Sequence, residues 1–139
     1  MQITRQADYA LRAMLYLAQL EPGQRAATSQ IAEDQKIPPS FLAKIISQLS
    51  IAGLIHTSRG ARGGVSLARQ PAGVSILEVV EAIDGPIALN ECTHDENACQ
   101  FGNSCPLRPL WCDTQAELTE RLRKTTFAQF IAEAQAEAA

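Results

Sequence analysis

Aromatic residues, histidines and long apolar runs are scarce in this sequence of 139 residues. Aromatic residues make up 5% of the chain, so its core must be built mainly from leucine, isoleucine, valine and alanine. No run of 18 apolar residues occurs, which excludes a hydrophobic transmembrane helix. Residues 1–8 lack the apolar centre of a signal peptide, and we therefore expect a cytoplasmic protein with no membrane partner.

The scarcity of catalytic side chains argues against an enzyme. Two histidines are present, no substrate-binding motif accompanies them, and ligands for a second redox centre are missing, which also disfavours an electron carrier. Residues 59–64, Arg-Gly-Ala-Arg-Gly-Gly, are rich in glycine but have neither P-loop spacing nor a following helix. We therefore expect a protein that is not an enzyme.

The distribution of charge is uneven between the two halves of the chain. The net charge of −3 is unpromising for a nucleic-acid-binding protein. Residues 1–70, however, carry eight Lys and Arg against four Asp and Glu, whereas residues 71–139 carry four against eleven. Such an asymmetry indicates that the first half alone meets a polyanion.

Apolar residues at helical spacing open the chain. Thr4 is expected to cap a first helix that ends near Leu20, because residues 21–23 are Glu-Pro-Gly. Residues 28–29, Thr-Ser, then offer a cap for a short helix over residues 30–35. A Pro-Pro turn after this helix predicts a sharp change of direction.

A third helix is expected over residues 41–51, capped by Ser40 and ended by Gly53. Two short helices joined by a tight turn are typical of a helix-turn-helix. Residues 54–68 then have the pattern of strand, glycine-rich turn and strand, which predicts a β-hairpin. A hairpin directly after a helix-turn-helix is a wing.

These two elements supply the candidate DNA contacts. The second helix of the motif would enter the major groove with its N-terminal half. Two arginines at the tip of the hairpin suit phosphate contacts or minor-groove insertion. The candidate DNA-binding residues are Ser40, Lys44, Ser47, Gln48, Arg59 and Arg62. A dimer would require a pseudo-palindromic operator with half-sites about one helical turn apart.

The C-terminal part is expected to be helical. Ser75 is a candidate cap for a helix over residues 76–83, and a last short helix is expected over residues 127–136. Between them, a long apolar stripe runs from Leu107 to about Lys124. Such a stripe on a small domain favours a homodimer through the helix from Leu107, although packing on its own domain is the alternative.

Three of the four cysteines share one polar loop. Cys92, Cys99 and Cys105 have the spacing C-x6-C-x5-C, and a reducing compartment disfavours disulfides between them. Clustered thiolates on a loop favour an iron–sulfur cluster, while the spacing alone leaves a zinc site open. Cys112 is interpreted as a core or interface residue with a residual role as a redox thiol, and His94 as a solvated loop residue.

In chain order, several segments resemble the Rrf family of winged-helix iron–sulfur transcriptional regulators. They are residues 3–4 and 8–13, residues 31–32, residues 49–55, residues 58–67, and the three loop cysteines. The resemblance implies a homodimeric repressor that binds operator DNA and switches with a bound iron–sulfur cluster. A 4Fe–4S cluster is favoured over a 2Fe–2S cluster. Nitric oxide, redox stress and iron or cluster supply all remain open as signals.

The resemblance also implies the fourth cluster ligand. Isc-type members use a histidine three residues after the last cysteine, but Arg108 stands there and cannot ligate iron because it stays protonated. Nitric-oxide-sensing members use an aspartate of the partner's first helix, which matches Asp8, with Arg12 one turn later. The implied ligands are Cys92, Cys99, Cys105 and Asp8, with Arg12 and Arg108 nearby. An ordinary role for Asp8 as a first-turn acid stays open.

Together these patterns predict a mainly α-helical protein with a small β-wing. A winged helix-turn-helix domain is expected over residues 1–84 and an iron–sulfur cluster-binding loop over residues 85–106. A dimerisation helix and a C-terminal helix are expected over residues 107–139. The alternative function is a zinc-stabilised or cluster-free DNA-binding regulator whose cysteine thiols sense the redox state.

Overall fold

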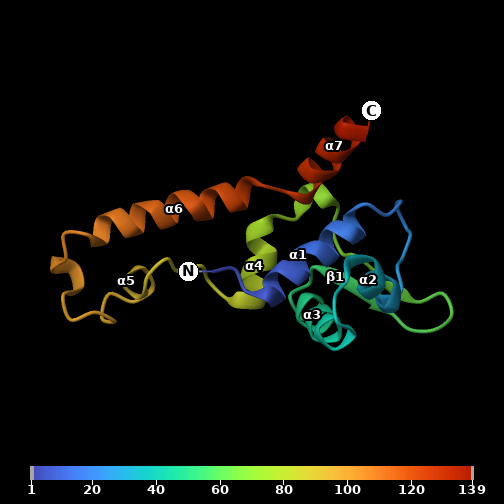
Figure 1. The fold of residues 1–139 in the computed structure, drawn as a ribbon, viewed down its shortest axis with the longest axis horizontal. Coiled ribbons are helices and arrows are strands. Elements are labelled where there is room, and N and C mark those ends of the chain that lie inside the picture. Colours follow the sequence, from blue (N-terminus) through green and yellow to red (C-terminus); the bar gives the residue numbers. More distant parts are fainter. Residues whose placement is uncertain (1, 139) are drawn as a thin grey trace.

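Helix α1 (Arg5–Ala18) lies at the centre of the fold in the computed structural model of the chain, which describes residues 2–138 (Figure 1). Its alanines Ala7, Ala10 and Ala13 have no exposed surface, so the helices around α1 can approach its backbone closely. The side chain of Thr4 accepts a hydrogen bond from the amide of Ala7, which confirms the predicted cap.

The helix-turn-helix consists of α2 (Thr28–Gln35) and α3 (Pro39–Ile51), joined by a turn in which Lys36 is left-handed, with φ 56°. The prediction that residues 28–29 and Ser40 cap these helices is wrong. Each helix begins earlier than predicted, after Ala27 and Pro38, and neither N-cap makes a side-chain hydrogen bond. The fixed φ of a proline in the first turn of α3 pre-organises that turn without a polar cap.

The predicted wing is an antiparallel pair of strands, β1 (Ile55–Ser58) and β2 (Gly64–Leu67), in which Ser58 pairs with Gly64 next to the loop. A third segment, which the sequence did not predict, pairs with this hairpin. Ala26, in the segment between α1 and α2, forms an isolated antiparallel bridge with Val65 of β2. The wing is therefore anchored to the chain that enters the helix-turn-helix.

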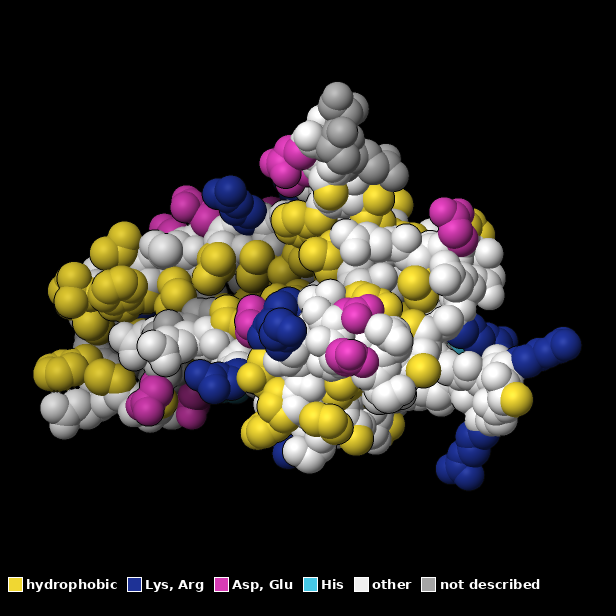
Figure 2. Space-filling model, turned by 45° about the vertical axis from the view of Figure 1, so that its right-hand side comes forward, with side chains coloured by type: hydrophobic (Ala, Val, Ile, Leu, Met, Phe, Trp, Pro, Cys, Tyr) yellow, Lys and Arg dark blue, Asp and Glu magenta, His cyan; other side chains and the backbone are white. Residues whose placement is uncertain are grey.

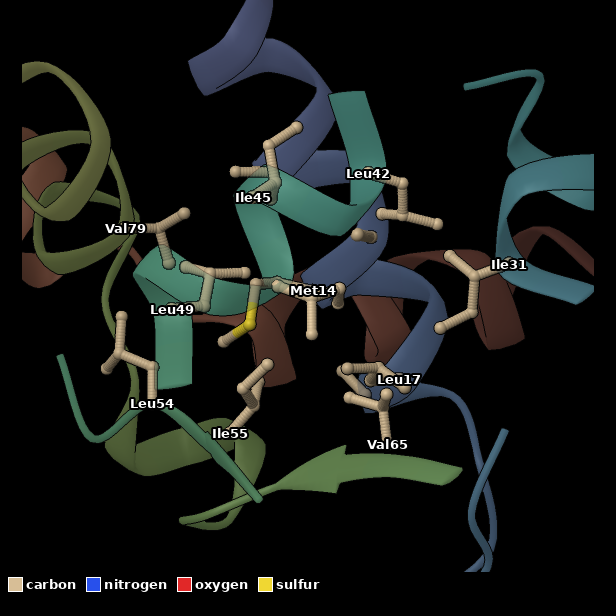
Figure 3. Packing of buried hydrophobic residues seen from close by; sticks show 14 of the residues in the cluster. Met14, Leu17, Ile31, Leu42, Ile45, Leu49, Leu54, Ile55, Val65 and Val79 are labelled. Atoms are coloured by element: carbon tan, nitrogen blue, oxygen red, sulfur yellow. The ribbon is translucent and has the colours of Figure 1, made fainter. Parts of the chain in front are cut away.

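A single core joins the helix-turn-helix, the wing and the two helices that flank them. Figure 3 shows its side chains pointing toward one another around Met14. They are contributed by α1, α2, α3, β1, β2 and α4 (Ile76–Asp84), the last of which is capped by Ser75 as predicted. Labelled there are Met14, Leu17, Ile31, Leu42, Ile45, Leu49, Leu54, Ile55, Val65 and Val79. Because α3 and the wing share this core, its packing holds them in a fixed position relative to each other.

Helix α6 (Arg108–Lys124) runs outward along one side of the domain and carries the cysteine loop at its far end (Figure 1). The two ends of the predicted apolar stripe differ in their burial. Leu118 and Leu122 pack against α4 of the same chain, around Leu77 and Val80. Leu107, Leu110 and Trp111, nearer the loop, are 58%, 55% and 37% exposed.

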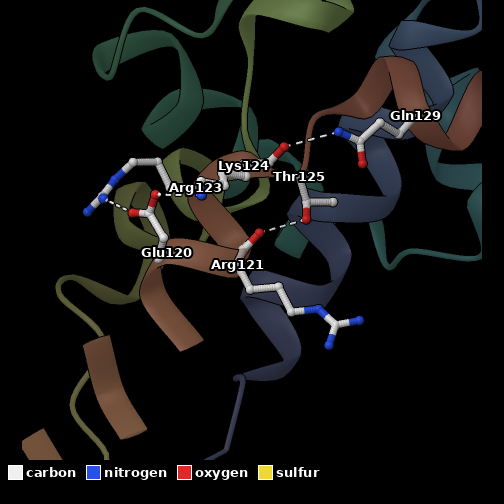
Figure 4. A network of polar contacts seen from close by, with 6 residues as sticks. All are labelled: Glu120, Arg121, Arg123, Lys124, Thr125 and Gln129. Atoms are coloured by element: carbon white, nitrogen blue, oxygen red, sulfur yellow. Dashed lines mark hydrogen bonds and ion pairs between the residues drawn. The ribbon is translucent and has the colours of Figure 1, made fainter. Parts of the chain in front are cut away.

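Helix α7 (Phe127–Ala138) returns to the domain and packs against α1. Phe127 is only 1% exposed and belongs to the main core. Figure 4 shows the polar contacts at the junction of α6 and α7. There, the Thr125 hydroxyl donates to the carbonyl oxygen of Arg121 at 2.7 Å, and Gln129 donates to that of Lys124 at 3.0 Å. Among residues 2–138, no helix is long and apolar enough to cross a membrane.

Candidate functional site

The outer face of α3 presents most of the side chains predicted to read DNA. Ser40, Lys44 and Ser47 are exposed on this helix. Gln48 is half-buried, and its side-chain oxygen is enclosed without a hydrogen-bond partner. Phe41 lies near the start of the helix, with 43% of its surface exposed. Its ring packs edge-on against the ring of Tyr9, with 6.2 Å between the ring centres. The start of α3 is thus an exposed surface of hydroxyls, one lysine and one aromatic ring.

The wing adds positive charge beside this helix. Arg59 and Arg62 both lie in the loop between β1 and β2, and both are exposed. In Figure 2, Lys and Arg side chains project from the end of the molecule where the wing lies in Figure 1. Cations held away from the protein body in this manner suit contacts with the backbone of a nucleic acid.

Asp8 and Arg12 lie together on α1 and face the helix-turn-helix. Their side chains form an ion pair at 3.3 Å, in which the Asp8 side chain is 60% exposed. The same guanidinium donates a hydrogen bond to the carbonyl oxygen of Gln35 at 3.0 Å and lies over the ring of Tyr9, at 4.8 Å from its centre. Arg12 therefore connects the first turns of α1 to the last turn of α2.

A second contact joins the same two helices further along. The hydroxyl of Tyr16 donates a hydrogen bond to a carboxylate oxygen of Asp34 at 2.9 Å. This hydrogen bond, together with desolvation and the Asp34 charge, raises the pKa of Tyr16 above its usual 10.0. The hydroxyl accordingly remains a donor at neutral pH, so Arg12 and Tyr16 of α1 both hold the C-terminal end of α2.

The three loop cysteines line one pocket. Cys92 lies in the short helix α5 (Glu91–His94), Cys99 in the following turn, and Cys105 directly after the 3-10 helix η2 (Gly102–Ser104). All three are free and half-buried, and they line a pocket of about 530 Å³ whose walls also include Leu107 and Trp111. Sulfur donors beside an apolar wall are the surroundings that an iron–sulfur cluster needs.

Arg108 secures this pocket from the first turn of α6. Its Nε donates to the carbonyl oxygen of Cys92 at 3.2 Å, and its terminal nitrogen donates to the side-chain oxygen of Asn103. One guanidinium thus holds the beginning and the end of the cysteine loop together. Sequence reasoning placed Arg108 near the cluster; the hydrogen bonds to the loop depend on the fold and could not be predicted.

Two further residues do not line the pocket within one chain. They are Asp8 on α1, predicted to act as a ligand from the partner, and Cys112 on α6, predicted to be a core or interface residue. In the part of the chain that the structure describes, no three Cys, His, Asp or Glu side chains converge closely enough to hold a single metal ion. The three sulfurs surround a space instead of meeting at one point.

Sequence reasoning missed one cation of the wing. Arg25, in the segment that pairs with β2, donates a hydrogen bond from Nη1 to the hydroxyl of Ser58 at 2.9 Å. No local motif marks this residue, because its position depends on the bridge between Ala26 and Val65, which are far apart in the sequence.

A helix-turn-helix, a wing fixed to it by a common core and exposed cations on both define the class of winged-helix DNA-binding proteins. Within that class, residues 3–133 match the family described as Rrf2, iron-dependent transcriptional regulator, and the chain belongs to this family. It is a DNA-binding transcriptional regulator. The resemblance seen in the sequence and the predicted fold are confirmed.

Curated relatives match over almost the whole chain. A helix-turn-helix-type transcriptional regulator of Mycobacterium tuberculosis H37Rv is 34% identical over 128 residues, which cover 92% of this chain and 80% of the relative. The helix-turn-helix-type transcriptional regulator NsrR of Shouchella clausii is 32% identical over 132 residues, covering 94% of this chain and 89% of that protein. Both relatives are described as transcriptional regulators.

Solved structures show the same architecture. CymR, the global cysteine regulator of B. subtilis, superimposes with a TM-score of 0.81 at 26% identity, covering 96% of this chain and 98% of that one. IscR of T. potens superimposes with a TM-score of 0.77 at 24% identity, covering 96% and 88%, and this match concerns the fold alone.

Proposed function

We propose that this chain is a homodimeric repressor whose hold on operator DNA depends on an iron–sulfur cluster bound by Cys92, Cys99 and Cys105. The observation that carries the proposal is the common pocket of these three thiols. In a 4Fe–4S cluster each thiolate binds a different iron, so the ligands must surround a space. The arrangement of the three cysteines fits this requirement better than it fits a single zinc ion, which needs four donors around one point.

The fourth ligand that we propose is Asp8 of the partner subunit. Three thiolates leave one cluster ligand to be supplied, and Arg108 stays protonated and cannot supply it. The Asp8 side chain is 60% exposed and lies away from the cysteine pocket of its own chain, so it is accessible to a second copy. The 4Fe–4S form is favoured over the 2Fe–2S form.

The homodimer is proposed to form through the free part of α6. Leu107, Leu110 and Trp111 are exposed in the single chain, and Phe101 of the cysteine loop is 60% exposed. Apolar surface of this kind at one end of a molecule is typical of an interface. The proposed Asp8 ligand requires that this two-fold dimer bring the partner's α1 within reach of the loop.

The chain's own residues offer a path from the pocket to DNA. A bound cluster would supply an iron centre that reacts with nitric oxide or oxidants. When iron is scarce, the chain would carry no cluster. Asp8 would be held by the cluster in the loaded state and released in the unloaded state. Because Asp8 pairs with Arg12, and Arg12 holds the last turn of α2, release changes the electrostatic surroundings of the helix-turn-helix.

Operator binding by loaded and unloaded protein tests the proposal. The protein would be purified without oxygen, and binding to the DNA upstream of its own operon would be measured before and after removal of iron by a chelator. We expect the two affinities to differ by at least tenfold, and we expect Cys99→Ser to resemble the unloaded form. Equal affinities in all three samples would contradict a role for the cluster in DNA binding.

The alternative is a regulator that uses the same cysteines as thiol sensors without a cluster. It is favoured by the structural likeness to CymR, a cysteine regulator, and by four free, half-buried thiols. A colourless protein whose operator binding responds to a mild thiol oxidant, and is unaffected by chelators, would support this alternative.

A further inference from the structure

The segment that leads into α2 forms an edge of the wing. Ala26 donates a backbone hydrogen bond to the carbonyl oxygen of Val65 at 3.0 Å and accepts one from the amide of Val65 at 2.8 Å. Ala26 is buried, with 7% of its surface exposed. Neighbouring residues of an extended chain point to opposite faces, so Arg25 lies on the solvent side of the wing, where it is exposed.

Gly64 makes this close approach feasible. A β-carbon at Gly64 would lie 2.8 Å from the carbonyl oxygen of Ala26 and 3.2 Å from the β-carbon of Arg25, and the residue has φ 144°. Any other residue at this position would push residues 25–26 away from the wing. The glycine therefore fixes Arg25 against the wing.

The guanidinium of Arg25 is held at the loop end of the wing. Its Nη1 donates a hydrogen bond to the hydroxyl of Ser58 at 2.9 Å. Ser58 forms the last pair of the hairpin, with Gly64, and directly precedes Arg59 in the loop. Arg25 is also three residues before the start of α2, so it lies between the wing loop and the helix-turn-helix.

Within the described residues 2–138, Arg25 has no carboxylate partner. Some arginines do: Arg12 pairs with Asp8, and Arg69 pairs with Glu78. Among residues 2–138, none of the ion pairs involves Arg25, Arg59 or Arg62. The wing thus presents three guanidinium groups whose charges can be met by an external anion.

We infer that Arg25 contacts a phosphate of the operator backbone as a third arginine of the wing, and that Ser58 orients it. Arg25 stands between the wing loop and the start of the helix-turn-helix, and both elements face the DNA backbone in winged-helix proteins. The planar guanidinium fork matches a phosphate, and its fixed position lowers the entropy lost on binding. This inference rests on operator binding through the wing.

The salt dependence of operator binding tests the contact. The logarithm of the binding constant is measured against the logarithm of salt concentration for wild type, Arg25→Gln, Arg25→Lys and Ser58→Ala. Each lost phosphate contact lowers the steepness of this line by about 0.9. We expect Arg25→Gln to lose about that amount, and Arg25→Lys to keep the wild-type slope because the charge remains. Ser58→Ala should weaken binding with its slope unchanged.

Two controls separate the contact from a structural effect. Arg69→Gln removes an exposed arginine that is already paired with Glu78, and its slope should equal that of wild type. Arg59→Gln should show a loss like that of Arg25→Gln. An unchanged slope in Arg25→Gln alone would overturn the contact, even if affinity falls. A wild-type protein with no salt-dependent operator binding would overturn both the proposed function and this contact.

Discussion

The guanidinium of Arg108 donates a hydrogen bond to the carbonyl oxygen of Cys92 at 3.2 Å, and so ties the first turn of α6 to the start of the cysteine loop. The same side chain holds Asn103 near the end of the loop. These two hydrogen bonds of Arg108 keep Cys92 and Cys105 on the walls of one pocket. In the proposed cluster site, Arg108 is therefore a residue that positions the cysteines and does not itself bind iron.

Replacing Arg108 with glutamine should make the cluster less stable without unfolding the protein. Loss of groups that orient metal ligands typically costs roughly 10–100-fold in metal affinity. We therefore expect Arg108→Gln to lose iron to a chelator at least tenfold faster than wild type, with an unchanged circular dichroism spectrum. Arg121→Gln is the matched control, because Arg121 is exposed further along α6. Equal rates of iron loss in all three proteins would show that the hydrogen bonds of Arg108 do not stabilise the site.

Asp8 can be tested as a ligand from the partner with mixed dimers. One chain carries Asp8→Ala, and the other carries Cys99→Ala and a different purification tag. If Asp8 acts across the dimer, the cysteines of the first chain meet the intact Asp8 of the second, and each mixed dimer holds one complete cluster. If Asp8 acts within its own chain, neither site is complete, and the spectrum should have the shape of that of the Asp8→Ala homodimer with no more than half its intensity, because only one chain keeps all three cysteines. The absorption spectrum and iron content of the purified mixed dimer distinguish the two outcomes.

The two exposed arginines of the wing loop should each contribute to DNA affinity through charge. We expect Arg59→Gln and Arg62→Gln to lower the steepness of the salt dependence by about 0.9 each, and the double variant by about twice that amount. The loss should be similar for operator and unrelated DNA, because phosphate contacts carry no base sequence. A loss confined to operator DNA would instead indicate that the wing reads bases or groove shape.

Helix α7 should be required for the stability of the DNA-binding domain, although it is the last helix of the chain. Phe127 is 1% exposed in the main core, so Phe127→Ala should lower the free energy of unfolding by about 3–5 kcal/mol. Phe130, on the same helix and 37% exposed, is the matched control and should cost far less. Denaturant unfolding measures both. Equal small effects would mean that α7 is not part of the cooperative domain.

Much of the fold could be predicted because it is encoded locally. Thr4, Ser75 and Gly53 act as the helix signals that their residue types indicate, and the alternation of apolar residues marked the wing. The errors occurred at the starts of α2 and α3, which follow Ala27 and Pro38 without a side-chain capping hydrogen bond. Helix boundaries are decided by such competing contributions, which a sequence pattern does not rank.

The candidate site was predictable in its composition but not in its geometry. The grouping of the cysteines on one loop predicted that they form a site, and the structure places all three on the walls of one pocket. The hydrogen bond from Arg108 to Cys92 and the hydrogen bond from Arg25 to Ser58 each join residues that are distant in the sequence. The division of the α6 stripe into a packed half and a free half is likewise set by where α4 lies. Tertiary contacts of this kind have no local signature.

The central claim is that Cys92, Cys99 and Cys105 hold an iron–sulfur cluster. Native mass spectrometry of protein purified without oxygen, together with assays of iron and acid-labile sulfide, tests it most directly. We predict a coloured protein in which each chain carries iron and sulfide in equal amounts, and in which Cys99→Ser has lost both. A colourless wild-type chain whose mass shows zinc, or no metal at all, would contradict the claim.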